Sequence, residues 1–599
     1  MKRPTTVVAL VTALAASFAA TAVPAQAAVS SASINDLTAT LNLDGAADNV
    51  TVSVSGGVLV HGQTTGGLNS GKDWDSGTDG DQTVPADGNR TVIVNAGDGN
   101  DAVTVLAKDT EIASVGLNGG NDDDVLTGAD SNDTLNGDAG NDRLVGAKGL
   151  DVMNGGAGND TLVWNNGDGS DTINGDAGND ATEVNGNATL DDVFTLEPNA
   201  GRVVFRRTNL VEFKLDTATE RIEANGLGGN DSLASSDGVG ALTLLSVDGG
   251  SGVDTVNGSD GPDLILGGEG NDVLSGGGGD DRVVGDRGGD TMNGGTGDDT
   301  LVWNNGDGTD VVNGDDGRDD VEVNGAPAAG DIFTVEPNGA RIKFDRTNLV
   351  PFSLDIGSSE TMHANGLGAN DSISVGEVGS YEVTGSGGAG NDTLTGAGSS
   401  ETFLGGSGND TITPGGGIDV VAADDGDDQV NVRDRTADLA RGGDGNDSVV
   451  ADVGQLDVLD GFEAVDRTPN VTPPPLLDHP TPPVTIHGGT VKVKRGIASI
   501  KVSSPAMAPG NSTGSLAVRT AKAVRLAGLK VTLQLGRTRF DIAPGASKTL
   551  KVKLAKGSQR LAGSNHRLKA LAVASTGTSG KIAQSSQRLT LALGRATTK

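Results

Sequence analysis

Aspartate recurs at every ninth residue over long stretches of this chain, usually after a glycine-rich segment. From 119 to 163, five consecutive nonapeptides run from GGNDDDVLT to GGAGNDTLV, and each has an acid at its sixth position. Carboxylate and main-chain carbonyl oxygens are hard ligands, and a flexible set of six to eight of them suits Ca²⁺. The candidate chemistry of these residues is therefore the binding of calcium.

The nine-residue spacing identifies twenty candidate metal ligands in three arrays. Trp164 and Asn165 interrupt the first array, and a WNNGDG segment at Trp303 interrupts the second in the same way. Glu401 takes the place of the aspartate in the third array, which departs most from the pattern. The candidate ligands are Asp124, Asp133, Asp142, Asp151, Asp160, Asp171, Asp180, Asp254, Asp263, Asp272, Asp281, Asp290, Asp299, Asp310, Asp319, Asp392, Asp410, Asp419, Asp428 and Asp447.

The other positions of the repeat predict how the aspartates are held. Glycines fall at positions one, two and four, where tight turns with positive φ favour them, and an aliphatic residue at position eight would fill a narrow core. If two repeats form one turn of a solenoid, residues 18 apart lie about 4.8 Å apart. Asp124, Asp142 and Asp160 then line one edge, and Asp133 and Asp151 line the other.

This pattern resembles that of the RTX (repeats-in-toxin) calcium-binding family, whose consensus GGxGxDxUx is matched here in at least a dozen tandem copies. The resemblance implies an all-β fold, a parallel β-roll in which several Ca²⁺ ions are held between turns by the aspartates above and by turn carbonyls. The RTNL-containing spacers and the basic C-terminal part are also similar to secreted calcium-binding proteins of actinobacteria. Asp122, Ser131, Glu401 and Pro414 depart from the consensus, which predicts weak sites in the first and third arrays.

Composition and charge narrow the possible functions. The chain has no cysteine, which excludes disulfides and thiolate metal sites, and its aromatic content of 2% is too low for a large globular core. From 488 to 599 the chain has 21 Lys and Arg against one acid, Asp541, so this part carries about +20 of the net charge of -38. The remainder carries about -58 and should repel nucleic acid and attract cations.

A duplication of 139 residues relates Asp160 to Asp299 and Asp216 to Asp355, so that each unit consists of an array and a β spacer. The basic end alternates polar and apolar residues in about seven short runs, which predicts a small β-sandwich. The predicted segments are a signal peptide (1–27), an N-terminal β cap (28–112), array 1 (113–186), a spacer (187–248), array 2 (249–325), a second spacer (326–384), array 3 (385–465), a proline-rich linker (466–487) and a basic β-sandwich-like domain (488–599).

No catalytic constellation is recognisable, because the five histidines form no HExxH pattern and there is no nucleophile elbow. We therefore predict a protein that is not an enzyme. The main alternative is an extracellular β-helix enzyme that acts on polysaccharide, with structural calcium and with Arg207 and Arg346 as charge-stabilising cations. Duplication of the spacer favours structural salt bridges for these arginines. Trp164 and Trp303 are predicted to plug an irregular turn rather than to stack on sugar.

The N-terminus has the charged, apolar and small-residue order of a secretory signal peptide, with cleavage expected after Ala27. We expect an extracellular calcium-binding rod without a transmembrane segment after cleavage, which folds when Ca²⁺ neutralises its aspartates. The basic C-terminal domain would attach it to an anionic cell wall or extracellular polymer. An adhesin or surface-layer role is the further alternative.

Overall fold

The computed structural model describes residues 29–453, except for 36, 44, 63–73, 75–80 and 83, together with 456–468 and most of the strands between 484 and 592. The predicted signal peptide, residues 469–483 of the proline-rich linker and most of the acidic loop at 73–81 lie outside the described residues. The described elements are all β-strands. None of the described segments is a helix that could span a membrane. The chain divides into two compact units, residues 1–323 with 352–360 and residues 324–351 with 361–599.

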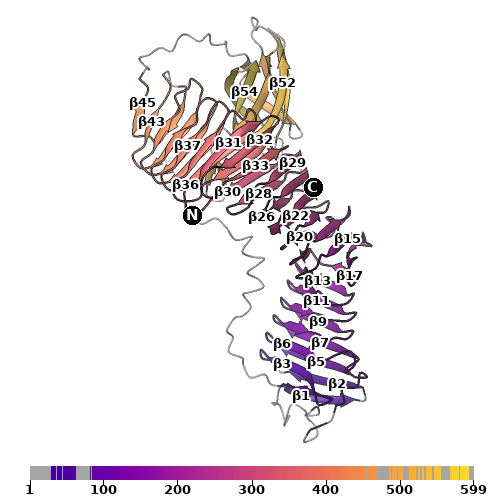
Figure 1. Cartoon of the computed structure of the whole chain (residues 1–599). Helices are drawn as coiled ribbons and strands as arrows, with labels where there is room; N and C mark the ends of the chain where they lie inside the picture. The colour runs from indigo at the N-terminus through magenta and orange to yellow at the C-terminus, as the bar shows by residue number, and fades with distance from the viewer. Residues whose placement is uncertain are drawn as a thin grey trace. The chain divides into compact units, whose positions relative to one another are not determined.

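The first unit is built from short parallel strands that stack turn upon turn (Figure 1). Val125 pairs with Arg143, and Arg143 pairs with Thr161, so one turn contains 18 residues, or two nonapeptides. This confirms the predicted solenoid repeat. One face carries β2 (Thr38–Leu43), β5 (Thr91–Asp98), β7 (Ser114–Asn121), β9 (Thr134–Ala139), β11 (Val152–Ala157), β13 (Thr172–Ala177), β19 (Ser232–Ser235), β21 (Thr255–Asn257), β24 (Val273–Gly278), β27 (Thr291–Gly297) and β29 (Val311–Gly317).

The second face of this unit alternates with the first along the chain. It carries β3 (Asn49–Ser55), β6 (Ala102–Leu106), β8 (Val125–Thr127), β10 (Arg143–Val145), β12 (Thr161–Asn165), β14 (Ala181–Asn185), β18 (Arg221–Asn225), β20 (Leu244–Asp248), β22 (Asp263–Leu266), β25 (Arg282–Val284) and β28 (Thr300–Asn304). The antiparallel pairs β1 (Val29–Asn35) with β2, and β3 with β4 (Val58–His61), stand at the N-terminal end of the stack.

The core of the solenoid is a thin column of aliphatic side chains. Leu126, Leu144 and Leu162 come from consecutive turns of one face, pair in register and are fully buried. Leu135 and Met153 do the same on the other face. Burial of one such side chain contributes roughly 1.5–3 kcal/mol, so each turn adds its own increment to the stability. This is the predicted role of the eighth position of the repeat.

The solenoid is interrupted by an antiparallel excursion. β15 (Val193–Asn199), β16 (Arg202–Arg207) and β17 (Phe213–Ala218) form a three-stranded antiparallel segment, and β17 returns to pair in parallel with β13. Across it, β14 pairs with β18 at a spacing of 40 residues, from Ala181 to Arg221. The spacer is therefore built into the stack as a wider turn.

The second unit repeats this architecture. It contains an antiparallel pair, β31 (Ile332–Asn338) with β32 (Arg341–Arg346), and two series of parallel strands. One series is β35 (Ser372–Val375), β37 (Thr393–Thr395), β39 (Thr411–Thr413), β41 (Gln429–Asn431), β43 (Ser448–Val450) and β45 (Ala464–Asp466). The other is β34 (Thr361–Asn365), β36 (Glu382–Ala389), β38 (Thr402–Ser407), β40 (Val420–Asp425), β42 (Leu439–Asp444) and β44 (Val458–Asp460).

The described C-terminal strands belong to the second unit and form a mainly antiparallel, eight-stranded sheet. β47 joins its two halves, because it pairs with β48 on one side and with β55 on the other. Strands are present in the described parts of the runs that the sequence predicted. The strands are β46 (Thr485–Ile486), β47 (Gly489–Lys494), β48 (Ile497–Ser503), β49 (Ser512–Thr520), β50 (Val524–Leu526), β51 (Leu529–Val531), β52 (Gln534–Ile542), β53 (Ser547–Lys553), β54 (Arg567–Thr578) and β55 (Lys581–Ala592).

Candidate metal sites in the glycine-rich turns

The repeat aspartates form ladders along the edges of the solenoid. The amide nitrogen of Asp124 donates to Oδ1 of Asp142 at 2.8 Å, and that of Asp142 donates to Oδ1 of Asp160 at 2.8 Å. A second ladder on the other edge links Asp133 to Asp151 at 2.8 Å and Asp151 to Asp171 at 2.9 Å. All twenty candidate ligands are buried, with at most 5% of each residue exposed.

The same arrangement continues in the other arrays. In array 2 the amides of Asp254, Asp272 and Asp290 each donate to the aspartate one turn ahead, and those of Asp263, Asp281 and Asp299 do so on the opposite edge. In array 3 one ladder joins Asp392, Asp410, Asp428 and Asp447, and Glu401 donates its amide to Asp419 on the other edge. The structure therefore places the candidate ligands in continuous rows, as the spacing predicted.

Each ladder uses only one oxygen of most carboxylates. Within the described part of the chain, Oδ2 of fifteen of the twenty aspartates is buried and accepts no hydrogen bond. A buried carboxylate oxygen without a donor is costly unless a cation compensates its charge. These atoms belong to Asp124, Asp142, Asp151, Asp160, Asp180, Asp254, Asp272, Asp281, Asp290, Asp299, Asp310, Asp392, Asp410, Asp428 and Asp447.

Carbonyl oxygens lie beside these carboxylate oxygens. A methyl group added to Gly137, at the first position of its repeat, would lie 2.3 Å from Oδ2 of Asp142 and 2.4 Å from the carbonyl oxygen of Gly155 in the next turn. At Gly276 the corresponding distances are 2.3 Å to Oδ2 of Asp281 and 2.5 Å to the carbonyl oxygen of Gly294. Two kinds of acceptor thus face the same small space, which is the donor set that suits Ca²⁺.

The surroundings disfavour bare negative charge on these aspartates. Burial raises the pKa of Asp124 to about 7, that of Asp290 to about 8 and that of Asp151 to about 9, from the ordinary 3.8. Neighbouring carboxylates of the same ladder raise these pKa values further, and the amide donated to Oδ1 opposes them. A divalent cation would reverse both unfavourable effects, so the residues present fit bound calcium.

Two candidate ligands have a different environment. Oδ2 of Asp133 accepts the amide of Ala129 at 2.6 Å, and Oδ1 accepts the hydroxyl of Ser131 at 2.6 Å. Asp263 is held in the same way by the amide and hydroxyl of Ser259. Because protein donors already satisfy both oxygens, these two aspartates are poorer cation ligands than their neighbours. For Asp133 this agrees with the weak site predicted from Ser131.

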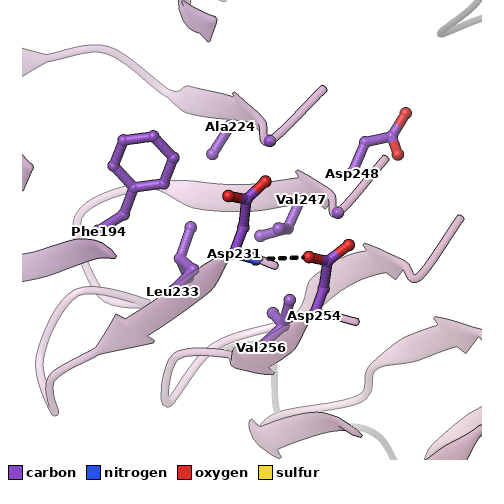
Figure 2. Close-up of a pocket in the computed structure, with 10 residues that line it drawn as sticks. Phe194, Ala224, Asp231, Leu233, Val247, Asp248, Asp254 and Val256 are labelled. Carbon is purple, nitrogen blue, oxygen red and sulfur yellow. Dashed lines mark hydrogen bonds between the residues drawn. The ribbon is translucent and has the colours of Figure 1, made fainter. Parts of the chain in front are cut away.

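The structure adds candidate ligands that the sequence reasoning missed. The amide of Asp231 donates to Oδ1 of Asp254 at 2.6 Å, and these two carboxylates lie beside Asp248 above the apolar side chains of Leu233 and Val256 (Figure 2). Oδ2 of Asp231 accepts no hydrogen bond from the described residues. The same holds for Asp371 and Asp438. The segment GLGGND, which ends at Asp231, has the spacing of a degenerate repeat and was the available signal.

The duplicated arginines are structural. Arg207 is 2% exposed, forms a 3.1 Å ion pair with buried Asp192 and donates to the carbonyl of Val211. Arg346 pairs with Asp331 at 3.3 Å in the second copy. The predicted salt bridges are therefore confirmed.

The tryptophans are structural as well. Trp164 is fully buried, stacks on Phe213 at 3.8 Å between ring centroids, and donates its indole N–H to the carbonyl of Gly169. Trp303 stacks on Phe352 at 3.7 Å in the same way. Both fill the irregular turn, as predicted, and neither is available to stack on a sugar.

A family model of calcium-binding repeats agrees with this geometry. The model of the RTX calcium-binding nonapeptide repeat matches residues 117–144, 127–162, 166–181, 248–283, 275–302, 384–412 and 435–455. The search of curated proteins found no match. Among solved structures, the extracellular lipase LipA from Serratia marcescens is similar at 18% identity, with a TM-score of 0.15, over 45% of this chain and 41% of that one. The chain thus spans less than half the length of that lipase.

The fold and the matched repeats together define the class of protein. The chain carries RTX calcium-binding nonapeptide repeats, and they form a parallel β-solenoid of the β-roll type.

Proposed function

We propose that this protein is a secreted calcium-binding β-roll that folds when it meets Ca²⁺ outside the cell and has a structural or surface-interaction role rather than an enzymatic one. The observation that carries the proposal is the set of buried Oδ2 atoms without hydrogen-bond donors among the described residues, several of which lie beside carbonyl oxygens of glycine-rich turns. Asp142, Asp160, Asp281 and Asp299 are among the residues that would hold the ions. Bound calcium would supply positive charge to these turns.

Coupling of folding to calcium follows from the electrostatics. The ladders bring carboxylates of successive turns together and remove them from water, which opposes folding in the absence of a cation. Extracellular modules typically bind calcium at about 10⁻⁴ to 10⁻³ M. Such sites would be largely vacant in a calcium-poor cytoplasm and filled after export, so that the chain would fold on the outer side.

A non-enzymatic role is supported by the burial of the two arginines that could have served as charge-stabilising cations in a β-helix enzyme. Arg207 and Arg346 are buried in ion pairs and have almost no exposed surface.

The basic C-terminal part has 21 Lys and Arg and only one acid from 488 to 599, and it would bind an anionic wall polymer by charge. Attachment through it should be released by high salt, and salt-resistant attachment would refute this part of the proposal.

Equilibrium dialysis of the chain without residues 1–27 tests the metal proposal. We expect many Ca²⁺ ions bound per chain at millimolar free Ca²⁺, and far fewer Mg²⁺ ions under the same conditions, because Mg²⁺ requires tight octahedral geometry. Equal binding of the two ions, or no binding of calcium, would overturn the metal proposal.

Secretion is tested by the intact mass of protein recovered from the medium, which should correspond to cleavage after Ala27.

A further inference from the structure

One face of the first unit has uncharged side chains along its strands. β9, β11 and β13 lie side by side in the stack, and their outward side chains alternate with the buried Leu135, Met153 and Ile173 (Figure 1). Asp138 and Asp176 follow near the ends of β9 and β13. The first two outward positions of each strand hold Thr134, Asn136, Val152, Asn154, Thr172 and Asn174.

The opposite face of the same turns has charged side chains at the corresponding positions. Arg143 of β10 forms an ion pair with Glu183 of β14 at 2.8 Å, across Thr161 of β12. Since 21% of the chain is charged, a face without charge needs a physical reason. The pattern recurs in arrays 2 and 3, where the equivalent positions hold Thr255, Asn257, Val273, Ser275, Thr291, Asn293, Val311, Asn313, Ser372, Ser374, Thr393, Thr395, Thr411, Thr413, Gln429, Asn431, Ser448 and Val450.

The amides of this face form a row with a fixed orientation. Nδ2 of Asn136 donates to Oδ1 of Asn118 at 2.7 Å, and Nδ2 of Asn154 donates to Oδ1 of Asn136 at 2.7 Å. Asn174 continues the row at one end and Asn95 at the other, also at 2.7 Å. A carboxamide has two N–H groups and an oxygen with two lone pairs, so each amide inside the row keeps one donor and one acceptor for a ligand.

Threonine hydroxyls lie beside the amide row. Thr134 and Thr172 are exposed, and among the described residues their hydroxyls take part in no hydrogen bond. The row extends from Asn42 to Asn174, and its five steps of about 4.8 Å make it about 24 Å long. Because the fold already orders these groups, a ligand that bound them would pay little for their loss of conformational freedom.

The polarity of the face defines the partner. The aspartate ladders along the edges of the solenoid would repel an anionic polymer. An apolar partner is disfavoured as well, because Val152 is the one apolar side chain among the six outward positions of β9, β11 and β13. An extended neutral molecule that carries many hydroxyl groups fits the face, since each hydroxyl both donates and accepts a hydrogen bond.

We propose that the uncharged face of β2, β5, β7, β9, β11 and β13 binds a neutral polysaccharide. The asparagine row and the hydroxyls of Thr134 and Thr172 would form hydrogen bonds with its hydroxyl groups. The proposal deepens the surface-interaction part of the proposed function and rests on it, because the face exists only in the folded solenoid. It is separate from the attachment of the basic C-terminal part to an anionic polymer.

Retention on insoluble cellulose, chitin, xylan and mannan tests the face in the chain without residues 1–27. The protein is first folded in millimolar Ca²⁺, and about 0.5 M salt screens the charges of the basic C-terminal part. We expect retention on at least one of the four polysaccharides. Thr134→Val combined with Thr172→Val removes two hydroxyls and keeps the side-chain shape. It should raise the dissociation constant about tenfold, the scale for two lost hydrogen bonds, and leave the circular dichroism spectrum unchanged.

Thr161→Val is the matched control, since Thr161 has the same position in its repeat but lies on the opposite face. It should leave the dissociation constant unchanged, and an effect equal to that of the double variant would overturn the proposal. Retention on none of the four neutral polysaccharides would also overturn it. So would binding only to alginate or polyglycerol phosphate that is lost in salt, because that behaviour belongs to the basic part.

A second copy of the chain is the competing occupant of this face. Sedimentation velocity in calcium distinguishes the two, because an interface between copies would give a dimer that the double variant dissociates, and that result would contradict the proposal. A chain that binds no calcium would show that the proposed function itself is wrong. A chain that folds with calcium but is retained on no neutral polysaccharide would refute only this surface.

Discussion

The amide nitrogen of Asp263 donates to Oδ1 of Asp281 at 2.8 Å, yet the two carboxylates differ in their second oxygen. Oδ2 of Asp281 has no hydrogen-bond donor among the described residues, whereas Oδ2 of Asp263 accepts the amide of Ser259. Two aspartates that the repeat pattern makes equivalent are therefore predicted to differ as metal ligands. This pair gives the most direct comparison within a single ladder.

Asp281→Asn should remove about one bound Ca²⁺ and lower the unfolding free energy in millimolar calcium by about 1–3 kcal/mol, the scale expected for loss of one ligand-linked site. In chelator the same change should stabilise the protein, because it removes a buried charge. Asp263→Asn is the control and should change the calcium stoichiometry little. Dialysis and urea denaturation measure these effects. A larger loss of calcium from Asp263→Asn would contradict the site geometry.

The pH dependence in chelator follows from the raised pKa values. Burial raises the pKa of Asp124 to about 7, that of Asp290 to about 8 and that of Asp151 to about 9. Between the ordinary value of 3.8 and these values the folded state binds more protons than the unfolded state, so stability falls as pH rises. The calcium-free protein should be most folded near pH 5 and progressively less so up to pH 9.

Circular dichroism in chelator across this pH range checks the prediction. The calcium midpoint should move the opposite way and increase as the pH is lowered, because protons and Ca²⁺ compete for the same carboxylates. A calcium-free protein that gains β-structure as pH rises from 5 to 9 would show that burial does not raise the pKa values of these aspartates.

Removal of the buried guanidinium of Arg207 should lower the free energy of unfolding substantially. Arg207→Met would leave Asp192 buried without its ion-pair partner, and loss of one member of a buried pair typically costs about 3–5 kcal/mol. Arg346→Met removes the equivalent pair with Asp331 and should cost a similar amount. Arg206→Met, on the partly exposed neighbour, should cost under about 1 kcal/mol. Denaturation in saturating calcium measures all three, and equal losses would argue against a special role for the pairs.

Glycine is required in the turns for two reasons: φ is positive, and at some positions there is no room for a Cβ atom. Gly158 and Gly167 have positive φ values of 139° and 104°, but only at Gly158 would a Cβ approach another atom, the carbonyl oxygen of Gly140 at 1.7 Å. Gly167→Ala should therefore cost about 1 kcal/mol from backbone conformation alone. Gly158→Ala should cost several-fold more, because successive turns would have to separate. Thermal unfolding in calcium compares them, and equal costs would show that the turns are not packed this closely.

Much of the fold could be predicted from the sequence because the repeat has a strict period. The glycines, the sixth-position aspartate and the eighth-position aliphatic residue fix an 18-residue turn, as the pairing of Val125 with Arg143 confirms. The two extra residues after Val163 predicted a register change, and the pairing of Thr161 with Ala181 shows a 20-residue turn there. The predicted domain boundaries remain predictions.

The details of the candidate sites could not be predicted, because they depend on single backbone orientations. The amides of Ala129 and Ser259 point at carboxylates, whereas the neighbouring repeats leave those oxygens unsatisfied. The repeats of Asp231 and Asp371, GLGGND and GLGAND, keep only two and one of the three consensus glycines, and these two aspartates were missed. Contacts between turns decide all of these cases, and one repeat read alone does not contain them.

The central claim is that calcium neutralises the aspartate ladders and so allows the solenoid to fold. Far-UV circular dichroism of the chain without residues 1–27, titrated with Ca²⁺ and in parallel with Mg²⁺, tests it most directly. We predict a cooperative transition from coil to β-structure with Ca²⁺, reversed by chelator and absent with Mg²⁺ at the same concentration. A solenoid that is already fully β-structured in chelator at pH 8, and that does not respond to calcium, would contradict the account.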